Sequence, residues 1–358
     1  MNEREKKILL SEFVSKKITL KNRFVMSPVP TGFVEKRTPT NENIKFYGDR
    51  ARSVGLIIAG AINIDHETAA NHERTPIITK ENLLVWQMIT EAVHQNNGKI
   101  VAQIWHSGGY RSFCLNVARV TTPSGIVSGK RRGDAMTIYE IATIISKFAE
   151  TAFYAKEAGF DGIEIHGAHG GLIHDFFCSD TNFRTDEYGI TNRTLFAEKI
   201  IRECRKAVGE FYPLLLRISN FKMYNFNAQL VQSPAEFEKF LLPISDAGVD
   251  MFDCSAIHYT DVAFASYDGS LAYWAKKITA KPTINVGCVG ACSPFSNDAN
   301  DIIQELTNHG KLPDKITGYG DSKLLHSEGL CRSMENSDFD LIAVGRPLLW
   351  NPDWVNNL

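Results

Sequence analysis

The sequence predicts an α/β fold, a (β/α)8 TIM barrel, built as a single domain over residues 1–358. Short, fully apolar runs alternate with amphipathic helical stretches, and such runs are typical of parallel strands that are buried on both faces. Eight of these units in a chain of 358 residues favour a closed barrel over an open sheet. A doubly wound sheet would also need a Gly-x-Gly-x-x-Gly turn after an early strand, and the sequence has none.

The predicted strands are read from apolar runs that are bounded by glycine, proline or polar residues. In chain order they are Arg23–Ser27, Gly55–Ala59, Lys99–Ile104, Gly162–Ile165, Pro213–Ile218, Val249–Cys254, Pro282–Val286 and Asp340–Val344.

The predicted helices lie between these strands and are read from apolar positions at helical spacing. They are Asn41–Ser53, Glu81–Gln95, Thr137–Ala158, Asn192–Val208, Pro234–Ala247, Leu271–Ile278 and Lys323–Met334. An insertion at 291–319 is long for a loop, and Asn300–Asn308 within it is expected to add a further helix.

Composition narrows the class of partner. The net charge is −2 and no lysine- or arginine-rich run is present, which argues against nucleic acid and anionic membranes as partners. The segment Met1–Leu10 is charged, and no apolar run approaches the length of a membrane span. We therefore expect a cytoplasmic protein, for which a homo-oligomer is compatible with the sequence. The seven scattered cysteines include no Cys-x-x-Cys pair, so we expect reduced thiols and no metal site among them.

The stretch Phe160–Leu172 carries the strongest indication of chemistry. A buried strand ends there in His166 and His169, within a glycine-rich loop. Two imidazoles at this spacing can donate hydrogen bonds to one carbonyl oxygen, or act as two metal ligands. They can also be loop histidines that are bonded to backbone groups.

Polar groups and glycines follow the other predicted strands, and a barrel brings all of these strand ends to one mouth. Glycines with an arginine after the last two strands are typical of a phosphate pocket, since backbone N–H groups approach the anion closely. An arginine near the end of the fifth strand can stabilise an anion that develops on a planar ligand, or pair with a carboxylate. These strand-end positions are Ser27-Pro28-Val29-Pro30, Ala61, Gln103, His106, Arg217, Gly287 and Gly345-Arg346.

Several segments spread along the chain carry a resemblance to one family. They are Leu20–Pro28, Gln103–Gly108, His166–Leu172, Asn182–Gly189 with Asn192-Arg193, and Gly345-Arg346-Pro347 with Asn351-Pro352-Asp353. Together they resemble the old yellow enzymes, which are FMN-dependent barrel oxidoreductases, and the resemblance runs from about Ile18 to Asp353, nearly the whole chain.

The resemblance implies FMN as cofactor, NADPH or NADH as electron donor, and a small-molecule substrate. It implies that the isoalloxazine ring is held by Ser27, Pro28, Val29, Pro30, Ala61, Gln103 and Arg217, and the phosphate by Gly287, Cys288, Gly345 and Arg346. His166 and His169 are then catalytic and bind the substrate's carbonyl or nitro oxygen. They stabilise the enolate-like charge that develops as flavin N5 delivers hydride to the β-carbon of an activated alkene.

The chain departs from the family pattern where a proton is needed. The family usually has a tyrosine proton donor at the position of Gly171, and a cysteine or threonine at Pro30. We expect the chain to bind FMN in spite of these departures. Because the tyrosine proton donor is absent, we expect enone reduction to be slow. A wider cavity at Gly171 is expected to admit bulkier substrates or water, and Gly171→Tyr to speed the enone selectively.

Two alternatives stay open at this point. One is a flavoprotein that reduces quinones or nitro compounds, which need no tyrosine proton. The other is a metal-dependent barrel hydrolase that uses His166 and His169, for which Asp253 is the one obvious acidic ligand. The larger iron–sulfur enoate reductases carry a cysteine cluster beyond the barrel, and we expect none here because no such cluster precedes Leu358.

Overall fold

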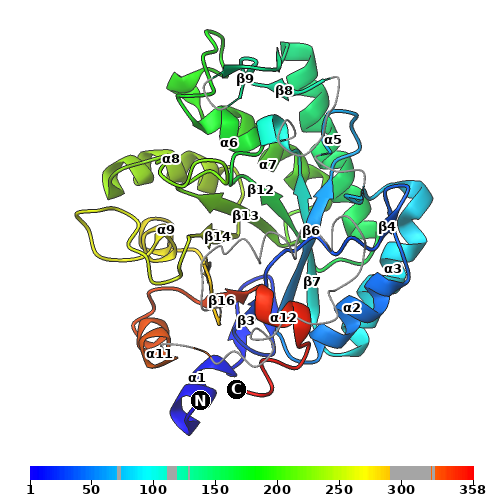
Figure 1. The fold of residues 1–358 in the computed structure, drawn as a ribbon, viewed down its shortest axis with the longest axis vertical. Coiled ribbons are helices and arrows are strands. Elements are labelled where there is room, and N and C mark those ends of the chain that lie inside the picture. Colours follow the sequence, from blue (N-terminus) through cyan, green and yellow to red (C-terminus); the bar gives the residue numbers. More distant parts are fainter. Residues whose placement is uncertain (71–73, 111–118, 128–129, 291–323, 325–326) are drawn as a thin grey trace.

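The structure, a computed structural model, describes residues 1–70, 74–110, 119–127, 130–290, 324 and 327–358. Eight parallel strands close into a barrel in the order β12-β13-β14-β15-β16-β3-β6-β7, and Figure 1 shows helices arranged around it. The predicted TIM barrel is confirmed. The barrel strands are β3 (Phe24–Met26), β6 (Leu56–Asn63), β7 (Lys99–Trp105), β12 (Gly162–His166), β13 (Leu214–Ser219), β14 (Met251–Ser255), β15 (Thr283–Val286) and β16 (Leu341–Val344).

The helices also lie close to their predicted bounds. They are α2 (Glu42–Ala51), α3 (Leu83–Gln95), α5 (Ile138–Glu157), α7 (Leu195–Val208), α8 (Pro234–Asp246), α9 (Leu271–Thr279) and α11 (Ser327–Glu335). Helix α11 begins later than the predicted Lys323, which lies outside the described residues, as does the predicted helix Asn300–Asn308.

Local sequence explains where the helices begin. Thr137 accepts the N–H of Glu140, whose carboxylate accepts the N–H of Thr137 in return, so this capping box starts α5. Ser233 caps α8 in a similar way, ahead of Pro234 at the first helical position.

Elements that the apolar pattern did not predict are short. They are the helices α1 (Glu3–Leu9), α6 (Leu172–Phe177) and α12 (Arg346–Trp350), the turns η1 (Lys80–Asn82), η2 (Gly108–Tyr110) and η3 (Ile190–Asn192), and the strand pairs β1 (Phe13–Val14) with β2 (Thr19–Leu20), β4 (Val34–Glu35) with β5 (Thr38–Pro39), β8 (Thr121–Thr122) with β11 (Asp134–Ala135), and β9 (Ile126–Val127) with β10 (Lys130–Arg131).

The inside of the barrel changes character along its axis because side chains two apart on a strand point the same way. Val101, Leu215 and Met251 belong to an apolar cluster inside the barrel. Two residues further on, the same strands carry Gln103, Arg217 and Asp253. The strand ends that follow therefore present polar side chains over an apolar floor, and this positions the site.

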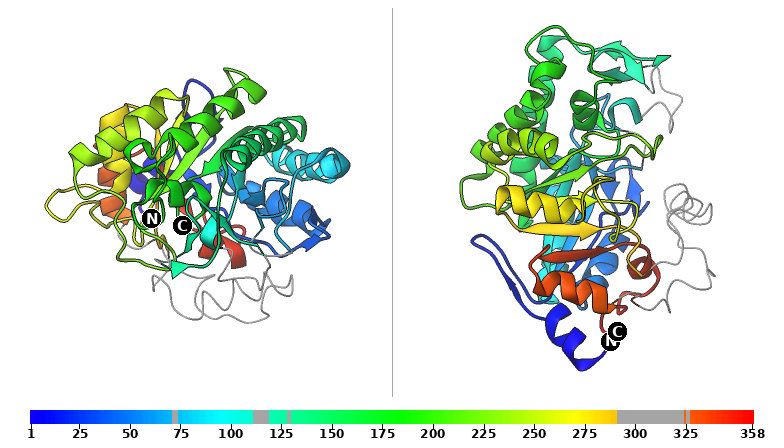
Figure 2. Two further views of the ribbon diagram at one scale, coloured as in Figure 1. Left: turned by 90° about the horizontal axis from the view of Figure 1, so that it is seen from above. Right: turned by 90° about the vertical axis from the view of Figure 1, so that its left-hand side faces the viewer.

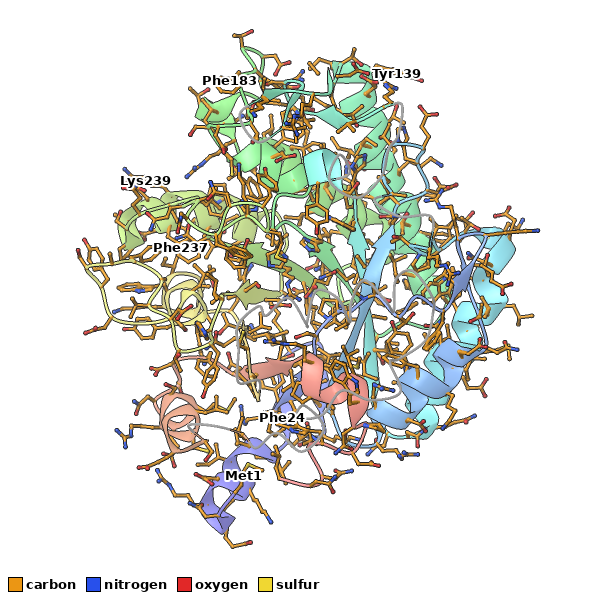
Figure 3. The ribbon with its side chains drawn as sticks, viewed as in Figure 1. Met1, Phe24, Tyr139, Phe183, Phe237 and Lys239 are labelled. Atoms are coloured by element: carbon orange, nitrogen blue, oxygen red, sulfur yellow. The ribbon has the colours of Figure 1, made fainter. Side chains whose placement is uncertain are left out.

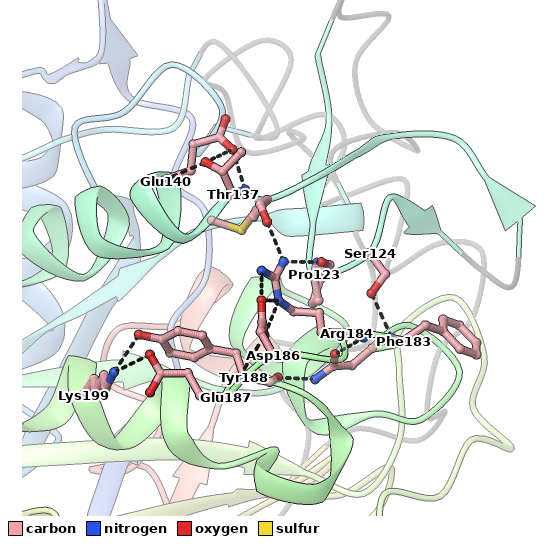
Figure 4. A network of polar contacts seen from close by, with 12 residues as sticks. Pro123, Ser124, Thr137, Glu140, Phe183, Arg184, Asp186, Glu187, Tyr188 and Lys199 are labelled. Atoms are coloured by element: carbon pink, nitrogen blue, oxygen red, sulfur yellow. Dashed lines mark hydrogen bonds and ion pairs between the residues drawn. The ribbon is translucent and has the colours of Figure 1, made fainter.

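The segment Asn182–Gly189 has a structural role beside this mouth. Arg184 Nη1 donates to the carbonyl of Pro123 at 2.7 Å and to that of Met136 (Figure 4). Asn182 Nδ2 donates to the carbonyls of Phe176 and Tyr188 at 2.8 and 2.9 Å. Asn182 and Arg184 therefore connect α6 to the part of the chain that contains β8 and β11. No side chain of Asn182–Gly189 lines the site.

The two ends of the chain meet on one side of the barrel (Figure 2), where the amino group of Met1 donates to the carbonyl of Leu358 at 2.7 Å. Figure 3 shows Tyr139 and Phe183 at the edge of the molecule, where their exposed fractions are 81% and 62%. Within the described part of the chain, no helix is long and apolar enough to span a membrane.

Candidate active site

One cavity of about 490 Å³ lies at the carboxyl ends of the barrel strands. It brings together every residue that the sequence analysis assigned to a cofactor or substrate: Ser27, Pro28, Val29, Pro30, Ala61, Gln103, His166, His169, Arg217, Gly287, Cys288, Gly345 and Arg346. His106 is the exception among the strand-end positions, since it is buried and its Nε2 contacts Thr68 Oγ1 at 3.0 Å.

The two histidines stand edge to face, with ring centroids 5.2 Å apart. His166 Nδ1 accepts the N–H of Ala168 at 3.2 Å. A neutral His166 with this contact carries its proton on Nε2, so that Nε2–H is the group it offers to a ligand. Trp105 stacks on the ring of His166, with centroids 5.6 Å apart, and so restricts its orientation.

Both histidines are neutral at ordinary pH. Burial lowers the pKa of His166 to about 3, and the positive charge of Arg217 adds to the effect. Burial and then Arg217 also hold the pKa of His169 well below its usual value. The pair can therefore offer neutral N–H donors to a ligand, and not imidazolium charge.

His169 differs from His166 in its partner. Its Nε2 lies 2.8 Å from the hydroxyl of Ser255, which follows Asp253 on β14 and lines the same cavity. The backbone of His169 has a left-handed φ of 63° and donates its N–H to Ser219 Oγ at 3.0 Å. A ligand oxygen that approaches His169 Nε2 has to share it with Ser255 or displace that hydroxyl.

Arg217 is buried and lines the cavity. Its Nη1 lies 3.2 Å from Asp253 Oδ2, but the contact is not aligned as a hydrogen bond. Arg217 Nε and Nη1 are buried and have no hydrogen-bond partner among the described residues. The side chain thus combines both roles that the sequence left open, as a carboxylate partner and as a buried donor facing a ligand.

Beneath Arg217, Glu164 and Asp253 form a buried carboxyl pair. Burial raises the pKa of Glu164 well above its usual value, and the neighbouring charge of Asp253 adds to the rise. Burial also raises the pKa of Asp253, against the opposing charge of Arg217. Glu164 is the member we expect to hold a proton. Its Oε2 accepts Gln103 Nε2 at 2.6 Å, so the amide oxygen is what Gln103 can offer to a ligand.

The far end of the cavity contains the glycines and Arg346. Arg346 Nη2 donates to Cys288 Sγ at 3.0 Å. A Cβ on Gly345 would meet only Ser27, at 3.8 Å, so space in front of this backbone is open to a ligand. Gly287 has a packing reason as well, since a Cβ there would lie 2.6 Å from the backbone of His258.

The expected wider cavity at Gly171 is wrong. A Cβ at this position would lie 2.6 Å from Trp105 Nε1 and 3.3 Å from the carbonyl of His106. Trp105 therefore fills the space that a side chain at 171 would enter, and its indole, 9% exposed, lines the cavity. Trp105 Nε1 has no hydrogen-bond partner in the described part of the chain.

Three contributors to the site were not predicted from the sequence: Glu164, Trp105 and Ser255. Each stands two residues from Gln103, His166 or Asp253 on the same strand, so strand periodicity could have found them. Tyr110, in η2 beyond the strand, also lines the cavity, and the sequence alone could not place it there. No group of three metal-ligating side chains is present in the ranges that the structure describes.

The chain is similar over most of its length to known flavin oxidoreductases. Residues 12–305 match the model of the NADH:flavin oxidoreductase / NADH oxidase family. An NADPH dehydrogenase of Bacillus cytotoxicus is 31% identical over 350 residues, covering 96% of this chain and 90% of the relative.

Solved structures show the same fold at lower identity. Morphinone reductase in complex with tetrahydroNAD superposes with a TM-score of 0.74 at 22% identity, over 98% of this chain and 89% of that one. The old yellow enzyme homologue from Zymomonas mobilis superposes with a TM-score of 0.71 at 24% identity, over 98% and 91%.

Proposed function

The chain belongs to the NADH:flavin oxidoreductase / NADH oxidase family, the old yellow enzymes, and from that premise we propose that it reduces activated alkenes, namely enones and nitroalkenes. It is an FMN-dependent oxidoreductase with NAD(P)H as the electron donor. Membership of this family overturns the alternative of a metal-dependent hydrolase. The observation that carries the proposal is the neutral His166, whose Nε2–H is fixed by the Ala168 contact within the same cavity as Arg217.

The cavity residues fit FMN. Buried polar atoms without a hydrogen-bond partner among the described residues include Ser27 Oγ and Arg217 Nε, and both residues line the cavity. We assign the ring to Ser27–Pro30, Ala61, Gln103 and Arg217, and the phosphate to Gly287, Cys288, Gly345 and Arg346. Burying donors such as those of Arg217 is costly unless a ligand accepts from them, which supports this assignment.

Bound FMN supplies the hydride in this chemistry. The protein's part is to hold the substrate oxygen at His166 and His169, where neutral N–H donors stabilise negative charge as it develops on that oxygen. The apolar and aromatic wall, which includes Trp105 and Phe221, excludes water and strengthens these hydrogen bonds.

The proposal is tested with the purified holoenzyme, NADPH or NADH, and three acceptors under anaerobic conditions: cyclohexenone, β-nitrostyrene and menadione. We expect saturated ketone and nitroalkane as products, identified by gas chromatography. Turnover of menadione alone would overturn the alkene proposal and leave the second candidate, a quinone or nitro-compound reductase. That candidate is favoured by Gly171, which has no proton to give.

A further inference from the structure

Alkene reduction needs a proton at the α-carbon, and position 171 cannot deliver one. Gly171 has no side chain, and the indole of Trp105 fills the space in front of it. Indole N–H is far too weak an acid to give up its proton at neutral pH, so Trp105 can donate a hydrogen bond but not a proton. The acid has to come from another wall of the same cavity.

Tyr110 is placed for this role. It lies in η2 directly after β7, the strand that carries Gln103 and Trp105, and it lines the cavity together with both histidines. Its ring centroid is 6.2 Å from that of Trp105, which in turn stacks on His166. The phenol of a tyrosine at this place can act as a general acid at neutral pH.

The turn that carries Tyr110 is held rigidly. Gly108 N–H donates to His106 Nδ1, and Gly109 N–H to Asp175 Oδ2, each at 3.0 Å. A Cβ on Gly108 would lie 2.6 Å from the backbone of Leu172, so η2 packs directly against the start of α6. This close packing places η2, which ends in Tyr110, beside the start of α6, directly after the loop that contains His169, and a positioned acid requires such an arrangement.

Other phenols are worse candidates. Tyr47 also lines the cavity, but it is 4% exposed, its hydroxyl contacts the backbone at Gly60, and burial raises its pKa further. Tyr188 accepts a hydrogen bond from Lys199 at 2.8 Å, away from the cavity. Tyr224 packs on Gly170 and, like Tyr259, is not among the described lining residues.

On the basis of the proposed alkene reduction, we infer that Tyr110 is the catalytic acid that protonates the substrate's α-carbon. Hydride adds to the β-carbon and forms a C–H bond there, while the π electrons of the alkene move toward the α-carbon and the oxygen held by the histidines. The α-carbon then takes the proton of the Tyr110 hydroxyl, which breaks that O–H bond. Solvent water returns a proton to the tyrosinate.

The test is Tyr110→Phe, beside Tyr139→Phe as a surface control and Tyr224→Phe as the rival phenol. Reoxidation of the reduced holoenzymes is followed by stopped flow with 2-methylcyclohexenone and with menadione. We expect Tyr110→Phe to slow reoxidation by the enone about 10²–10⁴-fold and to leave the rate of reoxidation by menadione unchanged. The long-wavelength charge-transfer band that a phenol gives when it binds over the flavin should also stay unchanged. The α-carbon of this enone becomes stereogenic, so the enantiomeric excess of the product should also fall in Tyr110→Phe as water protonates from either side.

Each other outcome has a defined meaning. If wild type reduces the enone and Tyr110→Phe matches it in rate and enantiomeric excess, the assignment of Tyr110 is overturned while the proposed function stands. A selective loss in Tyr224→Phe would likewise overturn it and move the role to that residue. A wild type that reduces menadione but never the enone overturns the proposed function, and the inference with it.

Discussion

The indole of Trp105 stands directly against the backbone of Gly171, so close that a Cβ at 171 would lie 2.6 Å from Nε1. Because of this contact, packing requires a glycine at position 171, and no empty space lies in front of it. Trp105 cannot easily retreat, because it stacks on His166 and is 9% exposed. The indole therefore occupies the space that the side chain of a tyrosine at position 171 would need.

Gly171→Tyr should accordingly impair the site rather than speed enone reduction. Overpacking of this kind typically costs about 1–3 kcal/mol of folding stability, so we expect Gly171→Tyr to lower the free energy of unfolding by about that amount, as measured by urea unfolding of the holoenzyme. The double variant Trp105→Ala, Gly171→Tyr should lose less than the two single variants together, since the clash is with the indole. Equal free energies of unfolding for Gly171→Tyr and wild type would contradict this account of the contact.

The barrel could be predicted because its strands are buried on both faces and read as apolar runs, as with Leu341–Val344. The thirteen cavity residues could be predicted from strand ends and from the family resemblance, since parallel strands deliver their ends to one mouth. The contact of Trp105 with Gly171 could not, because it joins the end of β7 to the start of α6, and their approach depends on tertiary packing. Pairing of Arg217 with Asp253 follows from strand register, which no single strand reveals.

Arg346→Ala should weaken FMN retention. The guanidinium lies beside Cys288 in the part of the cavity that we propose for the phosphate, and loss of one charge-assisted contact typically costs about 1.5–3 kcal/mol. The Kd for FMN should therefore rise roughly 10–150-fold, as measured by titration of apo-protein. Arg332→Ala is the matched control, because that side chain is 69% exposed and pairs with Glu328. An unchanged Kd in Arg346→Ala would remove Arg346 from the phosphate site.

His174→Gln should make the protein less sensitive to acid. Burial lowers the pKa of His174 to about 3, below the value of about 6.5 expected in the unfolded chain. The unfolded state therefore binds one more proton between these values, and the stability that neutral His174 contributes is present above pH ~6.5 and lost as pH falls toward ~3. The slope for one such group is at most about 1.4 kcal/mol per pH unit.

The difference between variant and wild type is the quantity to measure, by urea unfolding from pH 4 to 8. Asp175 acts in the opposite sense, since burial raises its pKa to about 7 and its contribution is lost as pH rises. Glutamine can still accept the Gly170 N–H that His174 Nδ1 accepts at 3.0 Å. His94→Gln, whose side chain is 39% exposed, is the control. Parallel pH curves for wild type and His174→Gln would refute the assignment.

Removal of His166 should weaken phenolate binding more than removal of His169. The Ala168 N–H occupies Nδ1 of His166 and so leaves Nε2–H as a dedicated donor, whereas His169 Nε2 is already shared with Ser255 at 2.8 Å. A hydrogen bond to a charged oxygen is worth about 1.5–3 kcal/mol, so His166→Ala should raise the Kd of p-chlorophenol roughly 10–150-fold. His166→Gln, which keeps an N–H donor, should restore part of the affinity.

Ser255→Ala should leave binding equal or tighter, because it frees His169. Both histidines are neutral at ordinary pH, so the ratio between the variants should be the same at pH 7 and pH 9. A larger loss in His169→Ala than in His166→Ala would show that the Ser255 hydroxyl positions His169 for the ligand instead of competing for it.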